Sequence, residues 1–143
     1  VRLVLNDISD EALRRLRRRI GERIPAPIWL HHDIAKPLPA GVPACDIWLD
    51  RAVLHFLLTE EDIGGYFRNL RTVIAPKGHV LLAEFAVHGA PKCAGLDVHR
   101  YSVEEMSERL GSEFSLVKAE KFTFMNPAGS PRPYVYALFK RMN

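Results

Sequence analysis

DIWLDRAVLHFL (residues 46–57) and LRTVIAPKGHVLL (residues 70–82) are the two stretches that decide the fold of this chain. The first joins a short apolar run to an apolar turn. The second joins the end of a helical pattern to a Pro-Lys-Gly turn and another apolar run. Continuous apolar runs are typical of strands that are buried on both faces of a parallel sheet. Their alternation with helical patterns predicts an α/β fold in which helices cover the sheet.

The same alternation extends outward in both directions. A residue that favours helix capping precedes each of three helical patterns, and acidic residues follow it in the first turn. The capping residues are Ser9, Thr59 and Ser102. Residues 87–101 read as an irregular loop, and 75–78 as a turn. We expect strands at 3–5, 28–30, 45–50, 79–85, 114–124 and 134–139, and helices at about 10–20, 60–74 and 103–110. The last two strands are joined without a helix, which favours an antiparallel pair.

Composition indicates the class of protein. The chain has 143 residues, of which 48% are hydrophobic and 26% charged, so we expect one domain over residues 1–143. No apolar run approaches the roughly 18 residues of a membrane span, and no secretory signal is visible. Two cysteines, Cys45 and Cys93, make neither a disulfide framework nor a zinc motif. These features predict a cytoplasmic protein with no metal site and no membrane contact.

Positive charge is concentrated in one segment. The net charge is +3, and five arginines fall between Arg14 and Arg19. Such a run can bind phosphate groups, or it can be the solvated face of an amphipathic helix. No basic-aromatic interleaving accompanies the run, so we favour the solvated face and do not expect nucleic acid as a partner.

Three segments resemble the class I (Rossmann-like) methyltransferases that use S-adenosylmethionine. Residues 3–13 look like that family's second strand, its acidic tip and the helix that follows. Residues 46–57 look like its fourth strand with the loop behind it, and residues 70–82 look like a helix, turn and fifth strand. The resemblance runs over essentially the whole chain and implies a three-layer sandwich, with a mostly parallel sheet and an antiparallel C-terminal hairpin.

The chain also departs from the family pattern. The family's first strand and its glycine-rich cofactor loop have no counterpart here, because the glycines are scattered from Gly21 to Gly129. We therefore interpret the chain as truncated before the second strand, with weak cofactor affinity. In the family plan the missing strand lies at the centre of the sheet, so its absence exposes two strand edges. We expect these edges either to pair across copies, as a homodimer, or to close by local rearrangement.

Two acidic strand ends are candidate cofactor contacts. A carboxylate at Asp7, with Ile8 beside it, can accept hydrogen bonds from two ribose hydroxyls. Asp7 can instead cap the following helix. The resemblance implies that Asp33 accepts the adenine amino group and that Ile34 packs on the ring. Asp33 can also be an ordinary loop aspartate.

A further group of candidates follows the third and fourth predicted strands. Asp50 and Arg51 complete the expected cofactor-binding set. Asp50 could contact the cofactor's amino group or the substrate, and Arg51 could also anchor an acidic substrate or simply pair with Asp50. His55 has a pKa range suited to taking a proton from an acceptor atom, although a place in the pocket wall is the favoured alternative. Phe85 could line the acceptor pocket or belong to the core. We expect Asp7, Asp33 and Asp50 to converge at one rim of the sheet.

The resemblance implies a methyltransferase that uses S-adenosylmethionine and acts on a small-molecule acceptor, with its activity impaired by the truncation. Methyl transfer needs alignment more than acid-base chemistry, so the lack of a catalytic triad does not argue against it. A non-catalytic fragment with a binding or structural role is the alternative. A weaker alternative is an RNA methyltransferase that binds its substrate through Arg14 to Arg19.

Overall fold

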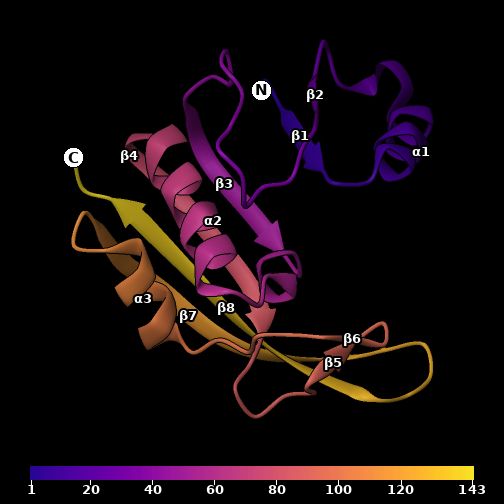
Figure 1. Ribbon diagram of the computed structural model, residues 1–143, viewed down its shortest axis with the longest axis vertical. Coiled ribbons are helices and arrows are strands. Elements are labelled where there is room, and N and C mark those ends of the chain that lie inside the picture. The colour runs from indigo at the N-terminus through magenta and orange to yellow at the C-terminus, as the bar shows by residue number, and fades with distance from the viewer.

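The computed structural model describes residues 1–143, and its main strands form two sheets that are separated by a gap (Figure 1). Two parallel strands, β1 (Val4–Asp7) and β2 (Ile28–His31), form the smaller sheet. The larger sheet has the order β3-β4-β8-β7, with β3 at Cys45–Arg51, β4 at Ile74–Phe85, β7 at Phe114–Met125 and β8 at Pro131–Arg141. A separate short hairpin joins β5 (Lys92–Cys93) to β6 (Leu96–Asp97).

The strand directions agree with the predicted fold class. Strand β3 is parallel to β4, whereas β8 is antiparallel to both β4 and β7. Strands β1 and β3 point the same way in Figure 1, so their carboxyl ends lie on the same rim of the molecule. The α/β fold with a mixed sheet and an antiparallel C-terminal pair is therefore confirmed.

The three helices begin at the capping residues that the sequence indicates. Helix α1 (Asp10–Ile20) begins after Ser9, α2 (Glu60–Val73) after Thr59, and α3 (Val103–Leu110) after Ser102. Each capping hydroxyl accepts a backbone N–H three residues further on, at 3.1–3.2 Å. Two single-turn 3-10 helices follow other elements, at Gly21–Arg23 and Leu54–Phe56.

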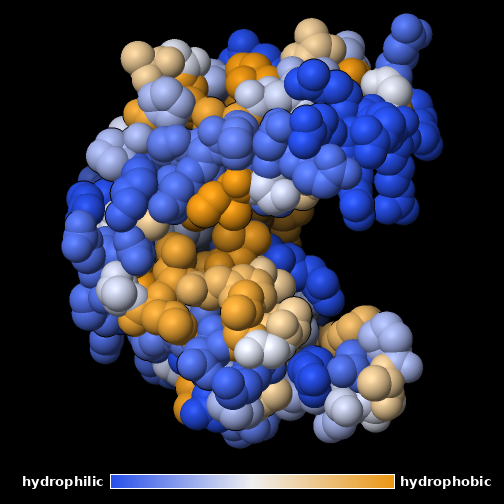
Figure 2. Space-filling view, turned by 45° about the vertical axis from the view of Figure 1, so that its right-hand side comes forward, coloured by the Kyte–Doolittle hydropathy of each residue, from blue (hydrophilic) through white to orange (hydrophobic).

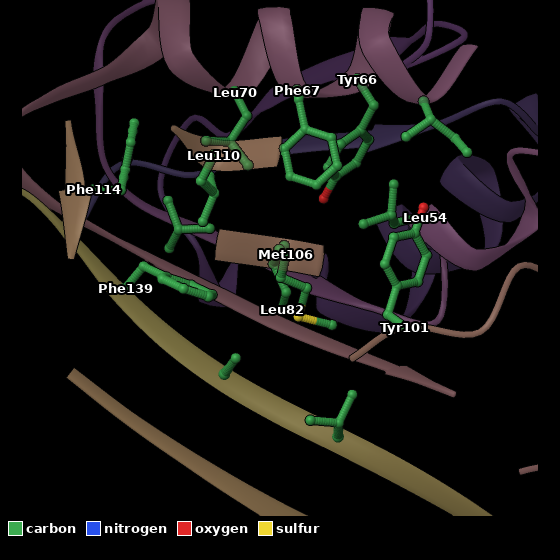
Figure 3. Close-up of a cluster of buried hydrophobic side chains, with 14 of the residues drawn as sticks. Leu54, Tyr66, Phe67, Leu70, Leu82, Tyr101, Met106, Leu110, Phe114 and Phe139 are labelled. Carbon is green, nitrogen blue, oxygen red and sulfur yellow. The ribbon is translucent and has the colours of Figure 1, made fainter. Parts of the chain in front are cut away.

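The hydrophobic core lies between α2, α3 and one face of the larger sheet. Figure 3 shows Phe67 and Leu70 of α2 pointing toward Leu110 of α3 and toward Leu82 and Phe139 of the sheet. These side chains are at most 2% exposed and belong to a cluster of sixteen buried residues. Burying such side chains stabilises a fold by roughly 1.5–3 kcal/mol each, so this half of the molecule holds most of the folding free energy.

Several element boundaries differ from the predictions, and β8 extends beyond the predicted 134–139 at both ends. Ile74 does not end the helix, because β4 begins there directly after Val73. The predicted turn at 75–78 lies inside β4, where the register with β3 shifts and Lys77 has a φ of 68°. The loop at 87–101 also contains the β5–β6 hairpin, whose turn residues Ala94 and Gly95 both have positive φ. A four-residue hairpin is too short to give a period-2 pattern in the sequence.

No strand of residues 1–143 lies between β1 and β3, and neither edge has a pairing partner on that side. Local rearrangement therefore does not close the gap, which corrects one of the two alternatives for these edges. Pairing across copies stays a prediction. Ile47 and Leu49 of β3 are 68% and 70% exposed, an unusual state for apolar residues of a parallel strand.

A loop that follows β2 connects the two sheets by packing on α2. The Asn69 side-chain amide donates to the carbonyls of Ile34 and Lys36 at 2.8 and 2.7 Å, and its oxygen accepts from the Leu38 N–H at 3.3 Å. Gly65 lets this loop approach, because a Cβ at that position would lie 1.9 Å from the carbonyl oxygen of Ala35. This close approach explains why a glycine lies inside the helix at this position.

Candidate functional site

Asp7 ends β1 at the rim where parallel strands present their carboxyl ends. Its side chain is half-buried, and Oδ1 accepts the Ser9 N–H at 2.8 Å. This bond fixes the turn into α1, which agrees with the capping alternative. A carboxylate can accept several hydrogen bonds, so one local bond leaves Asp7 able to receive ligand hydroxyls as well. Ile8 beside it is 68% exposed.

Asp33 lies two residues beyond the end of β2, next to Asp7 on the same rim. The His32 N–H donates to the Asp7 carbonyl at 3.1 Å, which extends the parallel pairing to the end of the strand. Asp33 Oδ1 accepts the Ala35 N–H at 3.0 Å, and its side chain stays half-buried. The adjacent Ile34 packs against the main core. The structure thus brings Asp7 and Asp33 together, as the sequence predicts.

Asn6 is a site residue that sequence reasoning missed. Its side-chain amide donates to the carbonyls of Leu30 and His32, at 2.9 and 3.0 Å. Asn6 therefore fixes the chain that leads to Asp33, and it positions one carboxylate relative to the other. The signal available in the sequence was the position of Asn6, a polar residue directly before the aspartate that ends the strand.

A cavity occupies the gap between the two sheets. Figure 2 shows a deep hollow in the molecule, and hydrophobic residues gather on its wall. The cavity is about 170 Å³ and is lined by side chains from both sheets, among them Val4, Asn6, Leu30, Ile34, Ile47 and Leu49. Typical small-molecule sites measure roughly 300–1,000 Å³. The enclosed space is therefore smaller than a site for a whole nucleoside cofactor.

Asp50 lies one residue before the carboxyl end of β3, with its side chain on the α2 face of the sheet, where it lines the cavity together with Trp48 and Tyr66. It is 6% exposed, and both of its oxygens accept hydrogen bonds: Oδ2 from the Tyr66 hydroxyl at 2.7 Å and from the Leu54 N–H, and Oδ1 from the Val53 N–H. The Trp48 indole N–H in turn donates to the Tyr66 oxygen at 2.8 Å. Burial raises the pKa of Asp50 above its ordinary value. The predicted contact between Asp50 and a ligand stays a prediction: Asp50 lines the cavity, and its oxygens already accept hydrogen bonds from within the protein.

His55 and Glu84 form a fully buried pair at the end of the sheet. Both side chains are 0% exposed, and His55 Nδ1 lies 3.0 Å from Glu84 Oε2 without the geometry of a hydrogen bond. Burial lowers the pKa of His55 to about 4, so the ring is neutral at pH 7. Burial, followed by the charge of Asp50, raises the pKa of Glu84 well above its ordinary value. A direct part for His55 in proton transfer stays a prediction, and its buried position does not support it.

Arg51 and Phe85 lie on the face of the larger sheet that α2 and α3 leave uncovered. Phe85 is 1% exposed and contacts Tyr134 edge to face at 5.1 Å, so it belongs to a small core rather than to an open pocket. Arg51 is exposed, and its Nε donates to the Tyr136 hydroxyl at 3.1 Å. Asp50 points to the opposite face, which corrects the alternative in which Arg51 pairs with Asp50.

The expected convergence of three aspartates is therefore correct for two of them. Asp7 and Asp33 share the rim of the smaller sheet, whereas the Asp50 carboxylate turns into the core of the larger one. No group of three or more His, Cys, Asp or Glu side chains is arranged to hold a metal ion. None of the helices is long and apolar enough to cross a membrane.

A family model described as a methyltransferase domain matches residues 1–82, more than half of the chain. The chain belongs to the class I, S-adenosylmethionine-dependent methyltransferase family. This match begins at the rim carboxylates and extends through β3 into β4. No curated protein sequence matches the chain.

Solved structures show the same fold at low sequence identity. The N-methyltransferase NodS from Bradyrhizobium japonicum WM9, in complex with S-adenosyl-L-homocysteine, is 18% identical with a TM-score of 0.75, over 99% of this chain and 67% of that one. A methyltransferase from Methanosarcina mazei is 12% identical with a TM-score of 0.76, over 99% and 82%. The 1,6-didemethyltoxoflavin-N1-methyltransferase from Burkholderia thailandensis is 17% identical with a TM-score of 0.68, over 98% and 61%.

This methyltransferase chain thus spans about two thirds of the length of NodS. S-adenosylmethionine is the cofactor of the family, and two of these structures contain its demethylated product. The residues present fit the nucleoside part of that cofactor, since Asp7 and Asp33 offer partly exposed carboxylates at or just beyond the carboxyl ends of adjacent parallel strands. Asp50 lines the cavity but is only 6% exposed, so its contact with the methionine part stays a prediction.

Proposed function

We propose that this chain carries the nucleoside-binding half of a methyltransferase site that acts on a small-molecule acceptor. One observation supports the proposal above the others: two half-buried carboxylates, Asp7 and Asp33, lie together at the carboxyl ends of parallel strands. In open α/β sheets this rim is where nucleotide ligands bind. S-adenosylmethionine supplies an activated methyl group on a sulfonium, so the protein's task is alignment and charge complementarity.

Each rim residue has a role in this proposal. Asp7 accepts hydrogen bonds from the ribose hydroxyls, and Ile8 shields one side of the sugar. Asp33 accepts from the adenine amino group while Ile34 packs on the ring. Asn6 holds the two carboxylates in place through its bonds to the carbonyls of Leu30 and His32.

The arginine-rich helix favours a small acceptor over RNA. On α1, Arg14, Arg15 and Arg18 lie within 3.3, 2.8 and 3.7 Å of carboxylate oxygens of Glu11. Arg17 stacks on the Trp29 ring at 4.8 Å. Asp10 and Glu11 offset part of the charge of this run, which weakens it as a site for phosphates. The two free cysteines support the cytoplasm as the proposed location.

A non-catalytic binding or structural role is the second candidate. The open gap favours it, because the cavity of about 170 Å³ encloses less space than a complete cofactor site. For the same reason we propose that residues 1–143 alone have impaired activity.

Calorimetric titration with S-adenosylhomocysteine tests the proposal. We expect weak binding to residues 1–143, weakened a further tenfold or so by Asp7→Asn, because a charge-assisted hydrogen bond to ribose is lost. Asp46→Asn is the matched control, since Asp46 is exposed and lies at the opposite end of β3. Equal affinity for all three proteins, or no binding at high ligand concentration, would contradict the proposal and favour the non-catalytic role.

A further inference from the structure

An exposed cation lies among aromatic side chains on the uncovered face of the larger sheet. The Arg51 guanidinium carbon lies 4.9 Å from the centre of the Tyr134 ring and 5.6 Å from that of Phe124. The Tyr136 hydroxyl accepts the Arg51 Nε–H at 3.1 Å. These contacts come from β3, β7 and β8, and they hold the side chain in one orientation across the small residue Ala83.

The register explains why these groups meet. Arg51 pairs with Ala83, and Ala83 pairs with Tyr136, so the three lie in one row across the sheet. Tyr134 and Phe122 form the next row, and Phe124 follows two residues further along β7. Residues in neighbouring rows on the same face lie close enough for long side chains to touch.

Arg51 has no anionic partner within the protein. The acidic groups of neighbouring elements already have cations of their own: Glu120 lies 2.6 Å from Lys118, and Asp97 lies 3.1 Å from Lys92. Asp50 and Glu84 point into the core on the opposite face. With Nε bonded to Tyr136, the two terminal nitrogens of Arg51 remain as a fork, the arrangement that binds a carboxylate through two parallel hydrogen bonds.

Exposed aromatic surface adjoins this fork. Phe124, which contacts the guanidinium, is 41% exposed, and Phe122, whose ring centre lies 6.5 Å from that of Tyr136, is 57% exposed. A flat ring can stack on them while its acid group reaches the guanidinium. Aromatic pairs of this kind stabilise a complex beyond the area that they bury.

We infer that Arg51, Phe122 and Phe124 form a binding site for a planar aromatic carboxylate, the class of methyl acceptor that this chain would take. The inference rests on the proposed methyltransferase function. Arg51 selects the acid group, Phe124 and Phe122 select the ring, and Tyr136 and Tyr134 position the guanidinium. Arg51 ends β3 at the same rim that carries Asp7, so acceptor and cofactor would approach one edge of the sheet.

Titration of residues 1–143 with 2-naphthoate, followed by NMR, tests this site. We expect signals of Phe124 and Tyr136 to shift and the neutral isostere 2-naphthamide to bind at least about tenfold more weakly. Arg51→Gln should weaken naphthoate binding by about tenfold, and Arg51→Lys by less, because lysine keeps the charge but not the fork. Arg68→Gln, at an exposed arginine of α2, is the matched control and should bind as the unaltered protein does.

Several outcomes would overturn the inference. They are the absence of naphthoate binding, equal binding of the amide, or unchanged affinity in Arg51→Gln while thermal unfolding shows that this variant is folded. The titration needs no cofactor, so it is read independently of the S-adenosylhomocysteine experiment. If the chain binds S-adenosylhomocysteine but not naphthoate, only the proposed acceptor site is contradicted. If it binds naphthoate but not S-adenosylhomocysteine, the proposed function is contradicted and the surface is a site for aromatic carboxylates.

Discussion

The two sheets of this molecule differ sharply in how they are stabilised. The β3-β4-β8-β7 sheet packs on α2 and α3 around sixteen buried core residues. The β1–β2 pair with α1 has one fully buried apolar side chain in its helix, Leu13, and its strands are half-buried or exposed. Two-stranded sheets are marginally stable by themselves. The smaller unit, which carries Asp7 and Asp33, therefore depends on contacts with the larger one.

This comparison explains where the functional groups sit. The proposed acceptor residues lie on the well-packed sheet, whereas the proposed cofactor residues lie on the weakly packed pair. The loop at Ile34–Leu38 joins the two units through Asn69 and Gly65. Regions with few buried contacts open at lower free energy than the core does. Cofactor affinity should therefore be more sensitive than acceptor affinity to changes in this loop.

The largest expected effect comes from the core of the larger sheet. Leu82 is 0% exposed and lies beneath α2 and α3, so Leu82→Ala should lower the free energy of unfolding by about 2–5 kcal/mol. Leu5→Ala, in the half-buried strand β1, should cost less than half as much. Urea unfolding of the two variants measures both values. Equal losses would show that the two units are stabilised alike and would contradict the comparison.

Adjacent glycines in α2 give a sharper test of the connection between the units. A Cβ at Gly65 would lie 1.9 Å from the Ala35 carbonyl oxygen, so Gly65→Ala should displace the loop and destabilise the protein by about 1–3 kcal/mol. A Cβ at Gly64 would meet only the end of the Arg68 side chain at 3.4 Å. Gly64→Ala should therefore stabilise α2 by up to about 1 kcal/mol.

Hydrogen exchange distinguishes a local effect from a global one in this glycine pair. In Gly65→Ala we expect faster exchange in β1 and β2 than in β4. Uniformly faster exchange would mean that the loop does not act as a separate connection between the sheets.

The smallest expected effect is a pH dependence within the buried polar cluster. Because burial raises the pKa of Glu84, folding favours its protonated form, and its contribution to stability falls as pH rises above about 4.5. His55 acts in the opposite direction: its pKa is lowered to about 4, so its contribution is lost as pH falls from about 6.5 toward 4. Asp50, whose pKa burial also raises, acts in the same direction as Glu84.

Glu84→Gln checks this sign. As pH rises above about 4.5, the stability of the unaltered protein should fall relative to that of Glu84→Gln, because only the unaltered protein must keep this buried carboxyl protonated. Urea unfolding at several pH values gives the slope of the unfolding free energy against pH for each protein. These slopes are compared, not the absolute free energies. Parallel slopes for the two proteins would mean that Glu84 is ionised in the folded state.

The sequence by itself determined the helices, most strands and the fold class. Helix caps such as Ser9, Thr59 and Ser102 act within a few residues, and apolar runs identify buried strands without knowledge of their neighbours. The acidic ends of β1 and β2 were predicted correctly for the same reason: the carboxyl ends of parallel strands share a rim.

Only the tertiary structure decided which polar residues face a ligand. Asp50, like Asp7, lies at the carboxyl end of a strand, yet Tyr66 and the backbone near Leu54 enclose its carboxylate. His55, which follows β3, lies fully buried against Glu84. The grouping of Arg51 with Phe124, Tyr134 and Tyr136 also depends on the register of three strands that are far apart in sequence. Local patterns specify where an element begins and which residues it contains. The direction and partners of each polar side chain depend on long-range packing, which no short segment of the sequence encodes.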